Sequence, residues 1–231
     1  MPNPRDPDVI AYKQLRTAIG LLAFFLPYLL ILGGILVCQE SPRPSISDYY
    51  YSCVRNIFVG MLCAIGVFMF SYRGYLAREY WLSRLASFTV IVVALCPTTP
   101  GHPTSAQKFV GAIHLLCAAV FFLILAYMSF FLFTRHGRRM TPQKRLRNLI
   151  YKVCGLIIFS SVLVIGGVKA AVGLDHTFHA PARYMLFFET VAILAFAISW
   201  MVKADGFTWL NDKRPGAAPQ SARGFWRFSG W

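Results

Sequence analysis

The sequence predicts an all-α fold: a polytopic six-helix transmembrane bundle with both termini in the cytoplasm. Two observations lead to this fold class. Six apolar stretches are separated by short polar loops, and the composition is 57% hydrophobic and only 14% charged, as expected for a protein solvated by lipid. Seventeen of the 23 Lys and Arg residues fall in four segments that would share one side: the two termini and the loops around Arg78 and Arg139. Positive residues in short loops stay in the cytoplasm, so these segments are assigned to the inside.

The elements follow in chain order. Residues 1–16 form a polar cytoplasmic arm, and residues 17–203 form the transmembrane domain. The expected spans are residues 17–38, 56–72, 85–97, 109–133, 149–172 and 184–202. The third stretch is the shortest, and it is retained because the charge alternation requires a crossing there. Gly155, Gly166 and Gly167 in the fifth span are expected to allow close contacts between helices. Residues 204–231 form a basic, aromatic tail with the Gly, Pro and Ser content of disorder.

Partners can be inferred from where the charge lies. The net charge of +14 sits in loops that flank apolar spans, which favours membrane lipids, including anionic headgroups at the cytoplasmic face, over nucleic acid. No serine lies in a GxSxG motif and no glycine-rich nucleotide loop is present. Soluble-type nucleotide chemistry is therefore not expected.

The cysteines carry no metal-type spacing. Three of them, Cys38, Cys53 and Cys96, fall near the predicted outer face. An oxidising compartment permits one disulfide among these three, and the sequence leaves the pairing open.

Polar side chains within the spans gather near the outer ends. Glu189 lies about one turn into the sixth span and His114 about two turns into the fourth. Polar groups are costly in hydrocarbon, so each is a candidate for function. Together with the first outer loop they predict a ligand pocket open to the outside. Its predicted members are Ser47, Asp48, Arg55, His114, Lys169 and Glu189.

Two physical accounts of this pocket remain open. In the first, His114, His176 or His179 and a carboxylate bind zinc, with an open fourth position that activates water. The metal candidates are His114, His176, His179 and Asp48, with Glu189 as the other carboxylate. In the second account, Glu189 pairs with Lys169 or Arg55, and His114 bonds a tyrosine or serine of the first outer loop. Such a pocket can still bind an anionic headgroup through its cationic side chains.

Several short segments resemble a known family. They are Pro-Ser-Ile-Ser-Asp at 44–48, Arg-Asn-Ile-Phe-Val-Gly at 55–60, HLLCAAVFF at 114–122 and ETVAILAFAISWMVK at 189–203. They resemble the Frag/DRAM/Sfk-type six-span membrane protein family and its bacterial relatives, which form a domain family of unknown function. Ile46-Ser47 and His114 match that family's outer-loop motif and its histidine early in span four. The resemblance implies a six-span architecture, a bacterial inner membrane and a role in handling lipids.

A more distant resemblance is to alkaline ceramidases and adiponectin receptors, which use Ser, Asp and three His around zinc. Ser45 to Asp48 and the outer histidines match that set in kind, although His176-x-x-His179 stands in a loop where that superfamily has HxxxH on its last helix. Three functions follow as hypotheses. The first is binding of a lipid headgroup or small anion, and the alternatives are a zinc-dependent lipid hydrolase and a proton- or ion-coupled transporter using Glu189 and His114. Whether the protein is an enzyme is left open.

Overall fold

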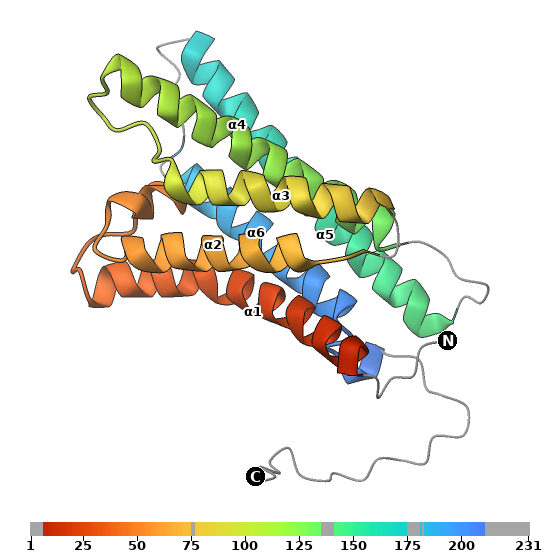
Figure 1. Ribbon diagram of the computed structural model, residues 1–231. Helices are drawn as coiled ribbons and strands as arrows, with labels where there is room; N and C mark the ends of the chain where they lie inside the picture. The colour runs from red at the N-terminus through yellow and green to blue at the C-terminus, as the bar shows by residue number, and fades with distance from the viewer. Residues whose placement is uncertain (1–6, 75–76, 135–140, 175–180, 182, 211–231) are drawn as a thin grey trace, which may run out of the picture.

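A computed structural model describes residues 7–74, 77–134, 141–174, 181 and 183–210. Over these residues the protein is all-α (Figure 1). The helices are α1 (Pro7–Leu36), α2 (Arg55–Ser71), α3 (Ala77–Leu95), α4 (Ser105–Tyr127), α5 (Pro142–Leu174) and α6 (Tyr184–Lys203). Three short elements accompany them: the 3-10 helix η1 (Ser47–Tyr51), the π-turn η2 (Met128–Leu132) and the 3-10 helix η3 (Thr208–Leu210).

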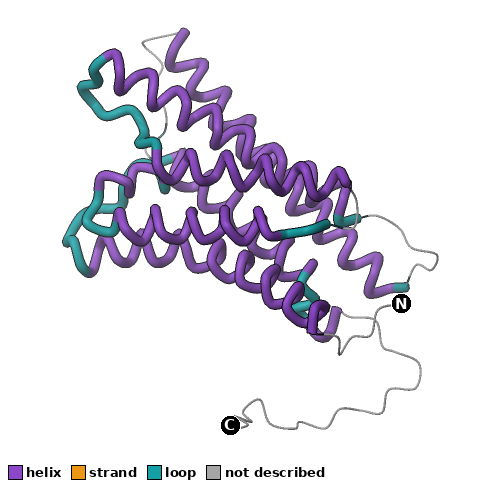
Figure 2. The backbone as a smooth tube through the Cα atoms, viewed as in Figure 1, coloured by secondary structure: helices purple, strands orange, loops and turns teal. Residues whose placement is uncertain are grey.

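The six helices form a closed ring. Each helix packs against the next one along the chain, and α6 packs against α1. The helices run back and forth, with the loops gathered at the ends of the bundle (Figure 2). Consecutive helices are antiparallel neighbours, as is common in helix bundles, and the longest described connection is the one between α1 and α2.

Among the residues that the structure describes, four helical segments are long and apolar enough to cross a membrane. They are Tyr12–Leu36, Ser105–Leu132, Pro142–Leu174 and Tyr184–Lys203. Large apolar side chains stand exposed around the ring, among them Phe88 and Leu116, each 65% exposed. Water solvates such a surface poorly and lipid tails solvate it well. The all-α class and the membrane character are therefore confirmed at this level.

Helix ends differ more from the prediction than helix positions do. Helices α2 and α6 begin and end within one residue of the predicted spans. In contrast, α1 begins at Pro7, inside the predicted arm, and α5 begins at Pro142, seven residues early. Hydropathy marks the part of a helix that suits hydrocarbon, whereas a helix continues into water as long as its backbone bonds persist.

Helix α3 is the element that hydropathy alone would miss. It begins at Ala77, eight residues before the predicted span, and its first turns carry Arg78, Glu79 and Arg84. These charges lower its hydropathy, and α3 is not among the segments apolar enough to cross a membrane. Buried serine hydroxyls of α3 form hydrogen bonds with the backbone of α2. Ser83 Oγ donates to the Met69 carbonyl oxygen at 2.6 Å, and Ser87 Oγ donates to that of Gly66 at 2.7 Å.

The first turns of α1 and the end of α6 lie side by side. Arg16 Nη1 donates to the carbonyl oxygen of Lys203 at 2.9 Å, and Lys13 Nζ lies 2.7 Å from Asp205 Oδ2. The start of α1 and the end of α6 therefore share one end of the bundle. The other end holds η1 and the loop between α3 and α4, and we call it the disulfide end, because Cys38 and Cys53 are bonded there.

Packing between α4 and α5 depends on one glycine of the three predicted. A methyl group at Gly155 would lie 2.8 Å from Phe130 Cβ and 3.0 Å from the Ala126 carbonyl oxygen. At Gly166 and Gly167 an added Cβ would meet no atom within 4 Å. The expectation of close helix contacts is thus correct for Gly155 and wrong for the other two, because the later turns of α5 leave open space at these positions.

Near Gly155, α4 passes into the π-turn η2. The Phe133 amide donates to the Met128 carbonyl oxygen at 2.9 Å, a bond that spans five residues instead of four. Within the turn, Ser129 Oγ lies 2.8 Å from Ser199 Oγ, and both serines are fully buried. The π-turn thus supplies a polar contact between α4 and α6 inside the ring.

The glycine contact predicts a difference between two variants of α5. We expect Gly155→Leu to lower the free energy of unfolding by about 1–3 kcal/mol, because the added side chain overpacks the α4–α5 contact. Gly167→Leu, the matched control in open space, should leave it nearly unchanged. Thermal unfolding of both variants in detergent measures this, and equal midpoints would contradict the packing.

Candidate functional site

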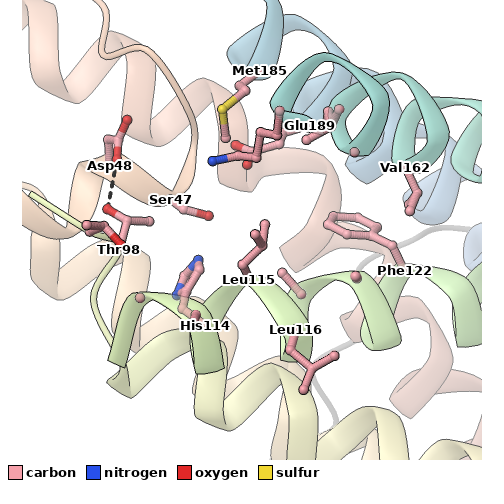
Figure 3. A pocket seen from close by; sticks show the side chains of 18 of the residues that line it. Ser47, Asp48, Thr98, His114, Leu115, Leu116, Phe122, Val162, Met185 and Glu189 are labelled. Carbon is pink, nitrogen blue, oxygen red and sulfur yellow. Dashed lines mark hydrogen bonds between the residues drawn. The ribbon is translucent and has the colours of Figure 1, made fainter. Parts of the chain in front are cut away.

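A cavity of about 760 Å³ opens at the disulfide end. Its walls come from η1, the α3–α4 loop, α4, α5 and α6. Five of the six pocket residues predicted from the sequence line it. They are Ser47, Asp48, His114, Lys169 and Glu189. Figure 3 shows Asp48, Ser47 and His114 around one part of this cavity, with Glu189 across from them.

Glu189 binds a backbone amide and not a cation. The Ile46 N–H donates to Glu189 Oε2 at 2.6 Å. Close by, the Leu186 N–H donates to the Pro44 carbonyl oxygen at 2.9 Å. The loop before η1 is thereby attached to the first turns of α6. The expected pairing of Glu189 with Lys169 or Arg55 is wrong, since neither forms an ion pair with it in the described part of the chain.

Asp48 connects η1 with the loop between α3 and α4. Thr98 Oγ1 donates to Asp48 Oδ1 at 2.8 Å, and Tyr51 Oη donates to the Thr98 carbonyl oxygen at 2.6 Å. Ser45 Oγ accepts the Asp48 N–H at 3.0 Å and closes the turn locally. Two loops that are distant in sequence therefore meet over the cavity.

His114 is held in one orientation. Its side chain is buried, and Nδ1 lies 2.6 Å from the Cys96 carbonyl oxygen. A carbonyl can only accept, so Nδ1 carries the proton and Nε2 of the neutral ring is left as an acceptor. The expected partner, a tyrosine or serine of the first outer loop, is wrong. Cys96, which directly follows α3, supplies the partner instead, because α3 packs against α4.

Arg55 is the one predicted pocket residue that lies elsewhere. Its guanidinium carbon lies 4.1 Å from the centre of the Tyr50 ring, and Nη2 donates to the Tyr50 hydroxyl. The side chain is exposed and does not line the cavity. Helix α2 begins at Arg55 directly after η1, so the side chain stacks back over the preceding turn.

Sequence reasoning missed Lys108, which lines the cavity together with Lys169. A signal for it was present in the spacing of α4, where Lys108, Leu115 and Phe122 follow at intervals of seven residues and share one face of the helix. Both lysines are exposed, and neither has an ion-pair partner within the residues that the structure describes. They line the cavity from adjacent helices, α4 and α5.

The structure describes two of the four residues predicted to bind zinc, Asp48 and His114. His176 and His179 lie outside the described residues. Among the residues that are described, no three or more His, Cys, Asp or Glu side chains are grouped closely enough to hold a metal ion. Asp48, His114 and Glu189 line the same cavity, but each is bonded to a different part of the chain.

The loop that carries Ser47 and Asp48 is closed by a disulfide. Of the three outer cysteines, Cys38 and Cys53 form the bond, and Cys96 is a free thiol. Tyr49 packs inside the loop with 1% exposure, directly over Gly34 of α1. Burial raises the pKa of the Tyr49 hydroxyl above its usual value. The loop is therefore a packed part of the structure, with its ends joined.

In comparisons with known proteins, no family model, no curated protein and no solved structure matches this chain significantly. The resemblance to the six-span family therefore stays a prediction.

The disulfide predicts a measurable link between the loop and stability. Reduction, or the double variant Cys38→Ser/Cys53→Ser, should lower the free energy of unfolding by about 3 kcal/mol, the value expected for closing a loop of about 15 residues. Thermal unfolding with and without reductant measures this in detergent. Cys96→Ser is the control and should behave as the unaltered protein. A reductant effect that persists in the double variant would contradict the assignment.

Proposed function

We propose that the protein binds a lipid headgroup or small anion in the cavity at the disulfide end, and that this cavity faces the outside of the cell. The observation that carries the proposal is the pair Lys108 and Lys169, two exposed ammonium groups on adjacent cavity walls without an ion-pair partner in the described residues. Each ammonium offers three N–H donors, which suit phosphate or carboxylate oxygens.

Within the described residues, neither carboxylate of the cavity forms an ion pair with Lys108 or Lys169. Glu189 Oε2 is bonded to the Ile46 amide, and Asp48 Oδ1 accepts from Thr98. His114 adds a neutral acceptor, and Ser47 adds a hydroxyl. A ligand with phosphate oxygens and further hydroxyl or amine groups matches this mixture of donors and acceptors.

The outward orientation rests on a proposed topology of six spans with both termini in the cytoplasm, in a bacterial inner membrane. Charge alternation supports it, because the disulfide end carries few of the positive residues. The Cys38–Cys53 bond is independent support, since disulfides persist in an oxidising compartment such as the periplasm. The bacterial membrane follows from the resemblance.

The topology predicts which positions a membrane-impermeant thiol reagent can reach. Ser41→Cys, in the exposed loop at the disulfide end, should react in intact cells. Pro142→Cys, exposed at the opposite end, should react only after the membrane is permeabilised. The reverse pattern would place the cavity on the cytoplasmic side and remove the basis of the proposal.

Binding predicts a contrast between two lysines of α5. We expect Lys169→Gln to weaken binding of phosphatidylglycerol by about tenfold, because a charge-assisted hydrogen bond is lost. Lys152→Gln is the control, since Lys152 is equally exposed on the same helix but lies outside the cavity. Native mass spectrometry of the full chain in detergent measures both. Equal binding by both variants would count against the cavity as the site.

No particular contact favours the two alternatives over this proposal. A zinc-dependent hydrolase needs a ligand set that includes His176 or His179, which lie outside the described residues. About one zinc per chain, lost in His114→Ala, would shift the proposal to that chemistry. A transporter needs polar groups that continue from Glu189 towards the opposite end of the bundle. Within the described residues, the hydrogen bond between Ser129 and Ser199 is a polar contact in that direction.

A further inference from the structure

The cavity changes character from one side to the other. Asp48, Thr98 and His114 lie together on one side in Figure 3, and Phe122 and Val162 lie on the other. The polar side offers charges and hydrogen bonds, whereas the apolar side offers only hydrocarbon contacts. A small free anion would use the polar side alone and leave the rest of the volume without a matching group.

The cavity as a whole extends far along the helices. On α4, cavity-lining residues run from Lys108 to Phe122. At 1.5 Å per residue this stretch is about 21 Å long, which exceeds half of a hydrocarbon core of about 30 Å. On α5, the lining runs from Lys169 back to Val162 at helical spacing. The cavity thus has the depth of roughly one membrane leaflet.

The apolar side is open towards the surroundings of the bundle. Leu116 lines the cavity and is also 65% exposed. From α5, Gly166 also lines the cavity, and a Cβ placed there would meet no atom within 4 Å. The gap between α4 and α5 therefore leads from the cavity to the apolar outer surface, which lipid tails cover. A chain can enter sideways from the bilayer.

We infer that the ligand is a membrane phospholipid, whose phosphate binds between Lys108 and Lys169 and whose acyl chain lies between α4 and α5 as far as Phe122. This inference rests on the proposed function and narrows it from any headgroup or anion to an intact lipid. Recognition of the headgroup comes from the polar side, and the apolar side holds the acyl chain by van der Waals packing, because a chain that comes from the bilayer gains little hydrophobic free energy.

Two neighbouring glycines allow a matched test. Gly166→Trp puts a large side chain into the apolar part of the cavity, and Gly167→Trp puts the same side chain one residue away, on a residue that does not line it. Native mass spectrometry of the full chain with phosphatidylglycerol should show binding at least about tenfold weaker for Gly166→Trp and nearly unchanged for Gly167→Trp. If Gly166→Trp fails to fold, Ala119→Phe provides the same test, because it fills the cavity from α4 and should also weaken lipid binding.

A second probe tests binding of the acyl chain separately from binding of the headgroup. Glycerophosphoglycerol carries the same headgroup without acyl chains, and it should compete with phosphatidylglycerol only at a far higher concentration. If it competes equally well, and the cavity-filling variants bind lipid normally, the acyl-chain inference is overturned while headgroup binding stands. If neither probe binds, or if Lys169→Gln leaves binding of both unchanged, headgroup binding in the cavity fails and the inference fails with it.

Discussion

The hydrogen bond from the Ile46 amide to the Glu189 carboxylate joins the first long loop to α6, and the polar side of the cavity depends on it. A carboxylate in an apolar helix is costly unless it is bonded, and here the backbone of the loop satisfies it. The same loop reaches Thr98 through Asp48, and its ends are joined by the Cys38–Cys53 disulfide. Folding of the loop and formation of the site are therefore one event: if the loop detached, Glu189 would lose its partner and the cavity its polar wall.

Much of the architecture, and the depth of each polar group, could be predicted from the sequence. A helix has a fixed rise per residue, so the position of Glu189 or His114 along its span is readable from the number of residues to the loop. This is why five of the six predicted pocket residues line one cavity. Where helices end was less predictable. The start of α3 and the first turns of α1 carry polar residues that hydropathy assigns to loops, although the backbone there is helical.

The partners of the site residues could not be predicted, because two of them are backbone groups. The Ile46 amide and the Cys96 carbonyl exist at every position of a chain and leave no mark in a sequence. Arg55 was misplaced for a related reason, since its direction depends on how η1 folds before α2. Lys108 was overlooked because it was counted as a loop charge, whereas its position on α4 gives it the same face as Phe122.

The π-turn that follows α4 determines how the last residues of this segment are rotated relative to the cavity-lining face. Each residue advances an α-helix by about 100°, and the turn from Met128 to Leu132 accommodates one residue more than a regular turn does. Before the turn, one face of α4 lines the cavity, and another, which includes Phe121 and Leu125, packs in the core. Within and after the turn, Ser129 and Phe133 contact α6. The turn thus sets the rotation of Ser129 and Phe133 relative to the cavity-lining face of α4. Deletion of one residue here would rotate one of these two surfaces by about 100° away from its partner.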